Sequence, residues 1–571
     1  MIDLIVRGGE LIDGTGAPRR RADLAIDAGE IVEIGDVSGR VARRTIDAEG
    51  HVVTPGFIDA HTHMDAQVAW DPLGESSCFH GVTTAIMGNC GFTLAPARAH
   101  ERHLVVRNLE RAEDIAAEAM EAGIDWCWET FPEYMDFVDR VPKGINYGCQ
   151  IGHSALRTWA MGERAFEEQA NEADLACMVT EVEAAVRAGA FGLTTSVSPS
   201  HATSDDRPVA SRIASWDEIA HLVAAMGRAG GGAFELAHSP DVRDADPARR
   251  EAYMRRLTRI AVDTGAMVTF GLLAFGADDH LWRPIVELLD RINAEGGRAW
   301  GQVHTRQFGL LLSFETRLPF DGLPEWHALR QGPLEEQKRA LRDPERRRRL
   351  VGIATTADYG QAIGAEARPP VWNAIFPLES ALPPFRSIES IAKERGVAPI
   401  DAFLDVALER DLRGFFMQSV ANQDQDRVLE LMRHRFAIPT FSDSGAHVSQ
   451  IMDSSLQTHL LAHWVREKQA FGLEETIHRL TRLPARAWQV PDRGVLAVGR
   501  AADVNVFDPD RVAPDLPELR HDLPGGAPRL RQTATGFLAT IVNGAVLLEK
   551  GEPTGVTPGA LLRRSPVAPK H

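Results

Sequence analysis

The segment that decides the fold is Gly56-Phe57-Ile58-Asp59-Ala60-His61-Thr62-His63, an apolar run that ends in two histidines. Pro55 and Gly56 mark its start, and the run predicts a buried strand. Because side chains alternate along a strand, His61 and His63 lie on the same side, where both imidazoles can reach one cation. Alone, a His-x-His pattern is usually just two ordinary polar residues, so its weight as a metal site depends on the surrounding sequence.

The segments at the two chain ends both predict β structure. Residues 1–55 contain short apolar runs between turn residues such as Gly8-Gly9 and Asp13-Gly14. Short apolar runs separated by turn residues also occur in residues 491–571, where Asn543-Gly544 predicts a hairpin. We therefore expect a small β-sandwich domain built from 1–55 and 491–571, with residues 56–490 as one continuous insert.

The insert alternates apolar strand-like runs with helical stretches, which is typical of a parallel βα barrel. The candidate strands are Gly56–His63, Val82–Cys90, Tyr147–His153, Ala190–Ser196, Ala233–His238, Met267–Leu273, Arg298–His304 and Ile438–Asp443. The predicted fold class is thus α/β, a (β/α)8 TIM-like barrel with a small β-sandwich domain. Since the carboxyl ends of barrel strands form the active-site face, we expect the polar residues that end these runs to converge. The stretch at about 305–437 is far longer than an ordinary barrel connection, and such insertions commonly act as lids or binding walls.

Two further residues at strand ends have metal-binding chemistry. Asp443, in Ser442-Asp443-Ser444-Gly445, can bind a metal ion and accept a proton from a water that the ion polarises. We favour this role over capping of the next helix. Cys90 lies in Gly88-Asn89-Cys90-Gly91, where glycines let the backbone turn tightly and a thiolate can bind zinc or bridge two ions. Its alternative is a buried, inert thiol.

Other candidates follow the remaining strands. His238 and His304 end the fifth and seventh runs, and either can bind metal or contact substrate. His153 and His201 follow the third and fourth runs and are candidates for substrate binding or for orienting ligands, with a structural role as the alternative. Arg306 can meet a substrate carboxylate through its planar fork, against the alternative of a surface ion pair.

Composition and charge argue against several classes of protein. The 571 residues are 44% hydrophobic and 25% charged, which is ordinary for a globular protein. A net charge of −18 argues against a nucleic-acid partner. We find no secretory signal, no stretch near the roughly 18 apolar residues of a spanning helix, and no disulfide framework among five scattered cysteines. We expect a cytoplasmic protein with a small-molecule substrate, no nucleic-acid or membrane partner, and homo-oligomerisation left open.

As a set, these motifs resemble the amidohydrolase superfamily, and more closely the D-aminoacylase (N-acyl-D-amino-acid deacylase) family. The resemblance extends over nearly the whole chain, through Gly56–His63, Gly88–Gly91, Gly152–Arg157, Ser442–His447 and the closing Gly494–Val504. It implies a barrel flanked by a β-sandwich, with one or two divalent metal ions, which we expect to be zinc.

The resemblance also assigns roles to individual residues. It implies metal ligands at His61, His63, Cys90 and His238, with the cysteine replacing the carbamylated lysine of other branches, and a base and ligand at Asp443. One departure is that the family's sixth-strand histidine should fall in 268–274, where this sequence has none. His304 can substitute for it, or the second metal site can be incomplete. We expect the chain length and the large insertion to mark a divergent, long subgroup.

The predicted activity is metal-dependent hydrolysis of a linear amide, through deacylation of an N-acyl (D-)amino acid or a related N-acyl compound. One alternative is a cyclic amide hydrolase of the hydantoinase or dihydroorotase type, but these enzymes ordinarily use a bridging lysine from the fourth strand, and Ala190–Ser196 contains none. A second alternative is a catalytically degenerate amidohydrolase-fold binding protein, favoured by the missing sixth-strand histidine. Metal analysis separates the two classes.

Overall fold

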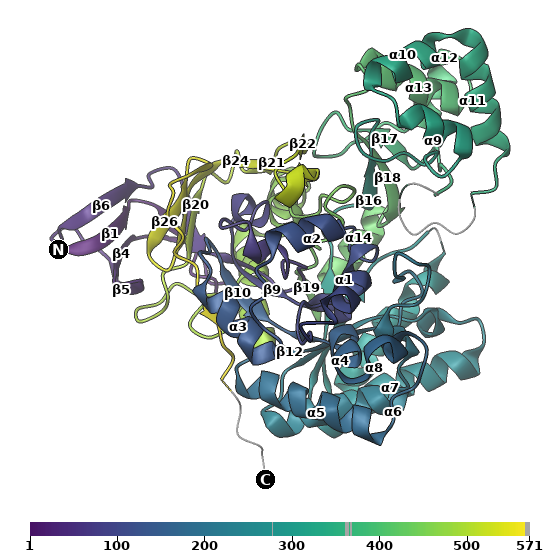
Figure 1. Cartoon of the computed structure of the whole chain (residues 1–571). Coiled ribbons are helices and arrows are strands. Elements are labelled where there is room, and N and C mark those ends of the chain that lie inside the picture. Colours follow the sequence, from purple (N-terminus) through teal and green to yellow (C-terminus); the bar gives the residue numbers. More distant parts are fainter. Residues whose placement is uncertain (277, 360–364, 366–367, 566–571) are drawn as a thin grey trace.

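The computed structural model describes residues 1–276, 278–359, 365 and 368–565. Parallel strands lie at its centre (Figure 1). In the order in which they neighbour one another, the strands are β8 (Phe57–Asp59), β9 (Val82–Met87), β10 (Asn146–Cys149) with its continuation β11 (Ile151–Gly152), β12 (Gly192–Ser196), β13 (Ala233–Ala237), β14 (Met267–Leu272), β15 (Arg298–Val303) and β19 (Ala437–Pro439). The ladders between them are parallel. The last and first strands meet where Thr62 bridges Ser444 and the Asp443 N–H donates to the His61 carbonyl. Each strand overlaps the run predicted for it.

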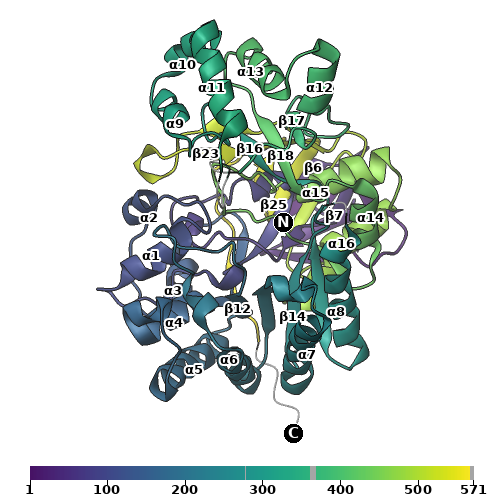
Figure 2. The same ribbon diagram turned by 90° about the vertical axis from the view of Figure 1, so that its right-hand side faces the viewer.

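Helices cover the outside of these strands, and Figure 2 shows several of them around β12 and β14. They are α4 (His153–Met161), α5 (Glu172–Arg187), α6 (Trp216–Ala229), α7 (Pro247–Thr264), α8 (Arg283–Ala294), α14 (Gln425–Arg433), α16 (Leu473–Leu480) and α17 (Arg482–Trp488). Outward-facing strand residues such as Phe234 and Leu236 join Leu257 of α7 in the main hydrophobic core. The inward side chains of five strands form a separate apolar cluster that includes Ile58, Ile86, Ala233, Met267 and Ile438. A filled interior of this kind leaves the strand ends as the place for a site.

The two chain ends share two sheets. One contains β1 (Ile2–Arg7), β4 (Asp23–Asp27), β5 (Glu30–Gly35) and β6 (Ala42–Asp47); the other contains β2 (Glu10–Leu11), β3 (Arg20–Arg21), β7 (Val52–Pro55), β20 (Val504–Phe507), β25 (Phe537–Val542), β26 (Ala545–Glu549) and β27 (Glu552–Pro553). N-terminal β7 pairs with C-terminal β20, and Asn543-Gly544 joins β25 to β26. Residues of both ends, including Leu24, Val504 and Ile541, share one hydrophobic core. Figure 1 shows these purple and yellow strands side by side.

Part of the C-terminal segment lies outside these two sheets. β28 (Leu561–Leu562) pairs with barrel strand β10, and β21 (Ala513–Pro514) pairs with β24 (Ala534–Thr535). β22 (Glu518–Arg520) and β23 (Arg529–Arg531) form a hairpin whose Leu530 N–H donates to the Val448 carbonyl at 2.7 Å. The predicted C-terminal domain thus also reaches the active-site face of the barrel. Its last positions, 566–571, lie outside the described residues.

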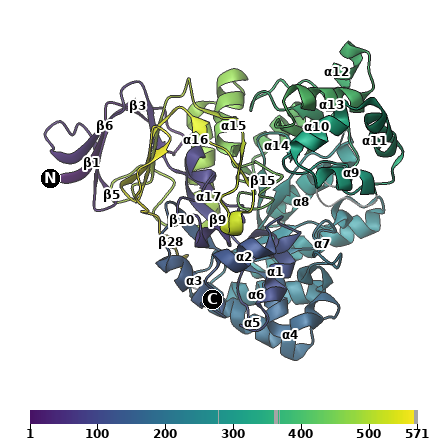
Figure 3. The ribbon, with the colours of Figure 1, turned by 45° about the horizontal axis from the view of Figure 1, so that its top comes forward.

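The long insertion has a separate hydrophobic core, and Figure 3 shows its helices gathered at the upper right. It contains the antiparallel sheet of β16 (Phe308–Leu312), β17 (Ile375–Pro377) and β18 (Phe416–Ala421), and helices α9 (Pro324–Arg330), α10 (Leu334–Arg342), α11 (Pro344–Thr356), α12 (Ile388–Arg395) and α13 (Pro399–Glu409). The insertion was predicted to extend to about residue 437, but it ends earlier, because α14 packs against strand β19 and so belongs to the barrel. Positions 360–364 and 366–367 of the stretch lie outside the described residues. Within the described part of the chain, no helix combines the length and hydrophobicity needed to cross a membrane.

Candidate metal centre

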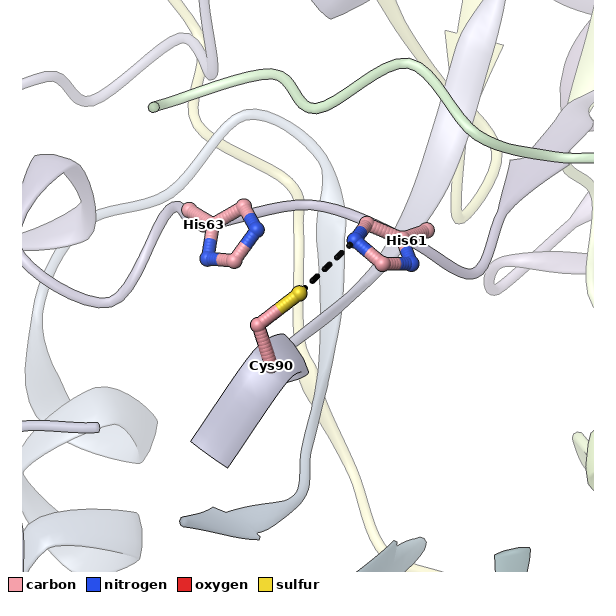
Figure 4. Close-up of side chains that lie close together, drawn as sticks. All are labelled: His61, His63 and Cys90. Carbon is pink, nitrogen blue, oxygen red and sulfur yellow. Dashed lines mark hydrogen bonds between the residues drawn. The ribbon is translucent and has the colours of Figure 1, made fainter. Parts of the chain in front are cut away.

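The two histidines that follow β8 meet the cysteine that follows β9. The ligand atoms of His61, His63 and Cys90 all lie within 4.8 Å of one another, and all three side chains are buried. Figure 4 shows both imidazoles turned toward the thiol, whose Sγ lies 3.6 Å from His61 Nε2. The spacing of two along the first strand therefore places both imidazoles on one side, as the sequence indicated.

The turn after β9 brings the thiol into position. Cys90 adopts a left-handed backbone with φ of 54°, which residues other than glycine rarely do. The turn depends on its flanking glycine, because a Cβ at Gly88 would lie 2.3 Å from the Gln150 carbonyl oxygen. A strained backbone at a buried thiol is typical of a functional site rather than of an inert core cysteine.

Asp443, just beyond β19, faces both imidazoles. Its Oδ1 lies 3.3 Å from His61 Nε2 and 3.2 Å from His63 Nε2. Burial alone would raise the pKa of Asp443, but hydrogen bonds from the two histidines outweigh it and hold the pKa well below its ordinary value. The carboxylate also lines a hollow that it shares with Gly445, Asp453 and Arg529. Asp443 is thus the member of the group that borders a cavity.

A glutamine orients the first imidazole. His61 Nδ1 lies 2.5 Å from the Oε1 of Gln302, on β15. Because the Gln302 oxygen can only accept a hydrogen bond, Nδ1 carries a proton and Nε2 is the ring nitrogen that faces Cys90 and Asp443. Two imidazole nitrogens and one sulfur are donors that zinc prefers, and a cation would take the place of the Nε2 protons that bond to Asp443.

Two buried glutamates complete the surroundings and were not anticipated from the sequence. Glu113 Oε2 lies 3.6 Å from His63 Nδ1, and burial raises the Glu113 pKa well above its ordinary value. Glu235 Oε2 accepts the Cys90 N–H at 2.7 Å, and burial raises the Glu235 pKa to about 7. The isolated acid in Phe234-Glu235-Leu236, an otherwise apolar strand, is a signal that could have identified Glu235. Glu113 follows a helical stretch and offers no such signal.

The other predicted metal-binding histidines lie outside the group. His238 Nδ1 is 2.7 Å from the Tyr253 hydroxyl on α7, and its Nε2 is buried without a hydrogen-bond partner. His304 Nε2 lies 3.5 Å from Asp453 Oδ2. Neither belongs to the described group of ligand atoms within 4.8 Å of one another. Burial lowers the pKa of each imidazole to about 3, so both are neutral.

His153 lies in a separate network with its hydrogen bonds satisfied. Its Nδ1 is 2.9 Å from the Thr195 hydroxyl and its Nε2 is 2.8 Å from Glu218 Oε1. Arg157 donates to both oxygens of Glu218 at 2.6 Å. Since both ring nitrogens have protein partners, this histidine has no free ligand atom.

The remaining two predicted substrate-binding residues are His201 and Arg306. His201 packs its ring 5.1 Å from that of Phe92, just beyond the Cys90 turn. Arg306 Nη1 donates to the Met452 carbonyl at 2.8 Å and to the Ser455 hydroxyl at 2.9 Å, and its Nε lies 3.6 Å from Asp453 Oδ1. Most of the Arg306 fork is therefore engaged by the protein.

This geometry is that of a metal-dependent hydrolase: nitrogen, sulfur and carboxylate ligands converge at the carboxyl ends of parallel strands. The model of the Amidohydrolase family matches residues 44–230 and 341–548, and the chain belongs to this family. The predicted superfamily is thereby confirmed, and with it the prediction of a hydrolase for carbon–nitrogen bonds other than peptide bonds.

The chain is also similar to individual proteins of this family. The D-aminoacylase of Alcaligenes xylosoxydans xylosoxydans is 27% identical, over 99% of this chain and 98% of that protein. The crystal structure of N-acyl-D-glutamate deacylase from Bordetella bronchiseptica, with zinc and a phosphonate inhibitor, is 25% identical with a TM-score of 0.64, covering 98% and 99% of the two chains. A D-aminoacylase crystal structure, 24% identical with a TM-score of 0.65, covers 99% and 100%. The predicted resemblance to the D-aminoacylase family is confirmed, at low identity.

Proposed function

We propose that this protein deacylates an N-acyl-D-amino acid or a related linear N-acyl compound, using a divalent metal ion, zinc, at His61, His63 and Cys90. The observation that carries the proposal is the convergence of three ligand atoms within 4.8 Å of one another. The adjacent carboxylate of Asp443 supports it. So does the similarity to a D-aminoacylase and to an N-acyl-D-glutamate deacylase that binds zinc.

His61, His63 and Cys90 would hold the ion, with Asp443 as a further ligand. When bound, such an ion acidifies water and polarises a carbonyl oxygen. Gln302 keeps His61 in the tautomer whose Nε2 can bind metal, since its Oε1 accepts a hydrogen bond from Nδ1–H.

Asp443 is the proposed proton carrier. Asp443 lines the hollow, whereas Cys90, His61 and His63 are not among its lining residues. Oδ1 or Oδ2 can take a proton from the attacking water and return it to the leaving amine. The β22–β23 hairpin lies over this hollow through Arg529 and Leu530, and so limits the access of bulk water.

Substrate contacts are proposed for Arg306, His304 and His201. Arg306 has Nη1 committed to Met452 and Ser455, whereas Nη2 makes only a 3.7 Å contact with the Met417 sulfur and Nε lies 3.6 Å from Asp453. A substrate carboxylate would replace these two weaker contacts. His304 is neutral and sits beside Asp453, and His201 lies beyond the Cys90 turn. For His153 we propose the structural role, because Glu218 and Thr195 occupy both ring nitrogens.

Matched substrates test the proposal. Metal-depleted protein would be assayed with N-acetyl-D- and N-acetyl-L-amino acids and with a hydantoin, before and after zinc is restored. We expect hydrolysis of N-acyl-D-amino acids that depends on zinc, and none of the hydantoin, since β12 offers no bridging lysine. Zinc-loaded protein that hydrolyses no N-acyl amino acid would overturn the proposal.

A further inference from the structure

Glu235 occupies an unusual place for a carboxylate. It lies at the middle of β13, where Phe234 and Leu236 on either side turn outward into the main hydrophobic core. Alternation therefore turns Glu235 inward, above Ala233 in the apolar cluster of the barrel interior. Its side chain is 1% exposed. An ionisable group in this position needs a partner to offset the cost of its burial.

The carboxylate of Glu235 is directed at Cys90. Oε2 accepts the Cys90 N–H at 2.7 Å, which fixes the left-handed turn. Oε1 lies 3.9 Å from the Cys90 Sγ. The same sulfur is 3.6 Å from His61 Nε2, so Cys90 lies between the histidine and the glutamate. Two acidic groups this close repel each other when both are ionised.

In the part of the chain that the structure describes, the nearby His61 imidazole is the basic group that acts on the Glu235 charge. Among the described residues, no lysine or arginine forms an ion pair with Glu235, in contrast to buried Glu218, which pairs with Arg157. Glu113 and Asp443 add two further buried carboxylates near the histidines. Buried acidic groups without a lysine or arginine partner are characteristic of metal sites.

We propose that Glu235 is a metal ligand, which with the Cys90 thiolate holds a divalent ion on the β13 side of the cluster. This inference rests on the proposed metal-dependent function and identifies a ligand for it. Cys90 is then shared between the histidine side and the Glu235 side, as a thiolate that bridges ions can be. Glu235 rather than His238 is proposed for this strand because its carboxylate contacts Cys90, whereas the described contacts of His238 are with Tyr253 and Phe270.

Cobalt binding tests the assignment without any substrate. Metal-free protein would be titrated with Co²⁺ while the thiolate-to-cobalt charge-transfer absorption is followed, and C90S would assign that band to Cys90. Glu235→Gln keeps the size of the side chain and an oxygen that can accept the Cys90 N–H, but removes the charge. We expect E235Q to bind Co²⁺ about 10–100-fold more weakly than the parent.

The matched control is Glu181→Gln. Glu181 on α5 is also buried and accepts a backbone N–H, from Phe131 at 2.6 Å, but it lies outside the cluster. E181Q should titrate like the parent. If E235Q also titrates like the parent, Glu235 only positions Cys90 and the proposal is overturned, as it is if the parent shows no thiolate band. If E235Q fails to fold by circular dichroism, E235D applies the same criterion, because its shorter side chain keeps the charge but withdraws the oxygen.

The cobalt titration can fail or succeed independently of the deacylase assay that tests the proposed function. Weaker cobalt binding by E235Q, in a protein that cleaves no N-acyl amino acid, would support the ligand and refute the deacylase. Zinc-dependent deacylation with an E235Q that binds cobalt like the parent would do the reverse.

Discussion

Two buried groups of histidine and carboxylate lie at the strand ends of the barrel, and they differ in one respect. In the first, His153, Glu218 and Arg157 satisfy one another, with both imidazole nitrogens hydrogen-bonded and the carboxylate held by two bonds from arginine. In the second, Asp443 faces the Nε2 atoms of His61 and His63 with no arginine among its described ion-pair partners. Residue type and burial are alike in both groups.

The difference lies in which ligand atoms remain open. A network in which both imidazole nitrogens and the carboxylate have protein partners stabilises the fold and leaves no metal-ligand atom open. In the second group, the Cys90 thiol and the two imidazoles bring ligand atoms within 4.8 Å of one another, and Asp443 Oδ1 lies within 3.3 Å of both Nε2 atoms, which suits a cation. We therefore assign catalysis to the Asp443 group and stability to the Glu218 group, and mutations should separate the two.

The largest effect is expected at Asp443. Asp443→Asn removes the proposed proton carrier and a charge beside the imidazoles, so kcat for the N-acyl amino acid should fall by about 10²–10⁴-fold. Steady-state kinetics with saturating zinc measure this loss, and thermal unfolding should show that the fold persists. Turnover within a few-fold of the parent would remove Asp443 from the mechanism.

Glu218→Gln should lower the stability of the fold and leave the metal centre intact. It leaves Arg157 buried without its charged partner, which should lower the free energy of unfolding by about 3–5 kcal/mol. Denaturant unfolding measures the loss, and zinc content of the folded fraction is the control, since the Cys90 group is untouched. Unchanged stability would show that the network is not what holds this part of the barrel.

Acid should weaken the same network. Burial would raise the pKa of Glu218, but His153 and Arg157 together lower it from 4.5 to about 2. Because the folded-state pKa is depressed, this stability is fully present above pH 4.5 and is lost as the pH falls toward 2. The shift corresponds to about 3 kcal/mol. Unfolding at stepped pH should reveal this loss in the parent but not in E218Q; parallel curves for the two would contradict the assignment.

The smallest effect is expected at Arg306. Arg306→Lys removes the planar fork, so KM for an N-acyl amino acid should rise about tenfold, equivalent to about 1.4 kcal/mol, while kcat changes little. An N-acyl amine without a carboxylate is the control substrate, and its kinetics should not respond. Equal losses on both substrates would mean that Arg306 only supports Met452 and Ser455.

Much of this account could be predicted from the sequence, for physical reasons. Strands buried on both faces are continuous apolar runs, so all eight were found, and the period of two placed His61 and His63 together. Whether a histidine is satisfied depends on residues distant in the chain, and so nothing near His153 indicated its bond to Glu218. The separate hydrophobic core of the insertion and the β22–β23 hairpin also depend on contacts between residues distant in the sequence, so neither was predicted.

The central claim is that the His61, His63 and Cys90 group holds a catalytic divalent ion whereas the Glu218 network does not. Metal analysis after equilibrium dialysis against zinc tests it most directly, on the parent, a His61→Ala/His63→Ala double variant and a His153→Gln variant. We expect the parent and H153Q to retain zinc alike, and the double variant to lose it while still folded. A folded double variant with the zinc content of the parent would contradict the account.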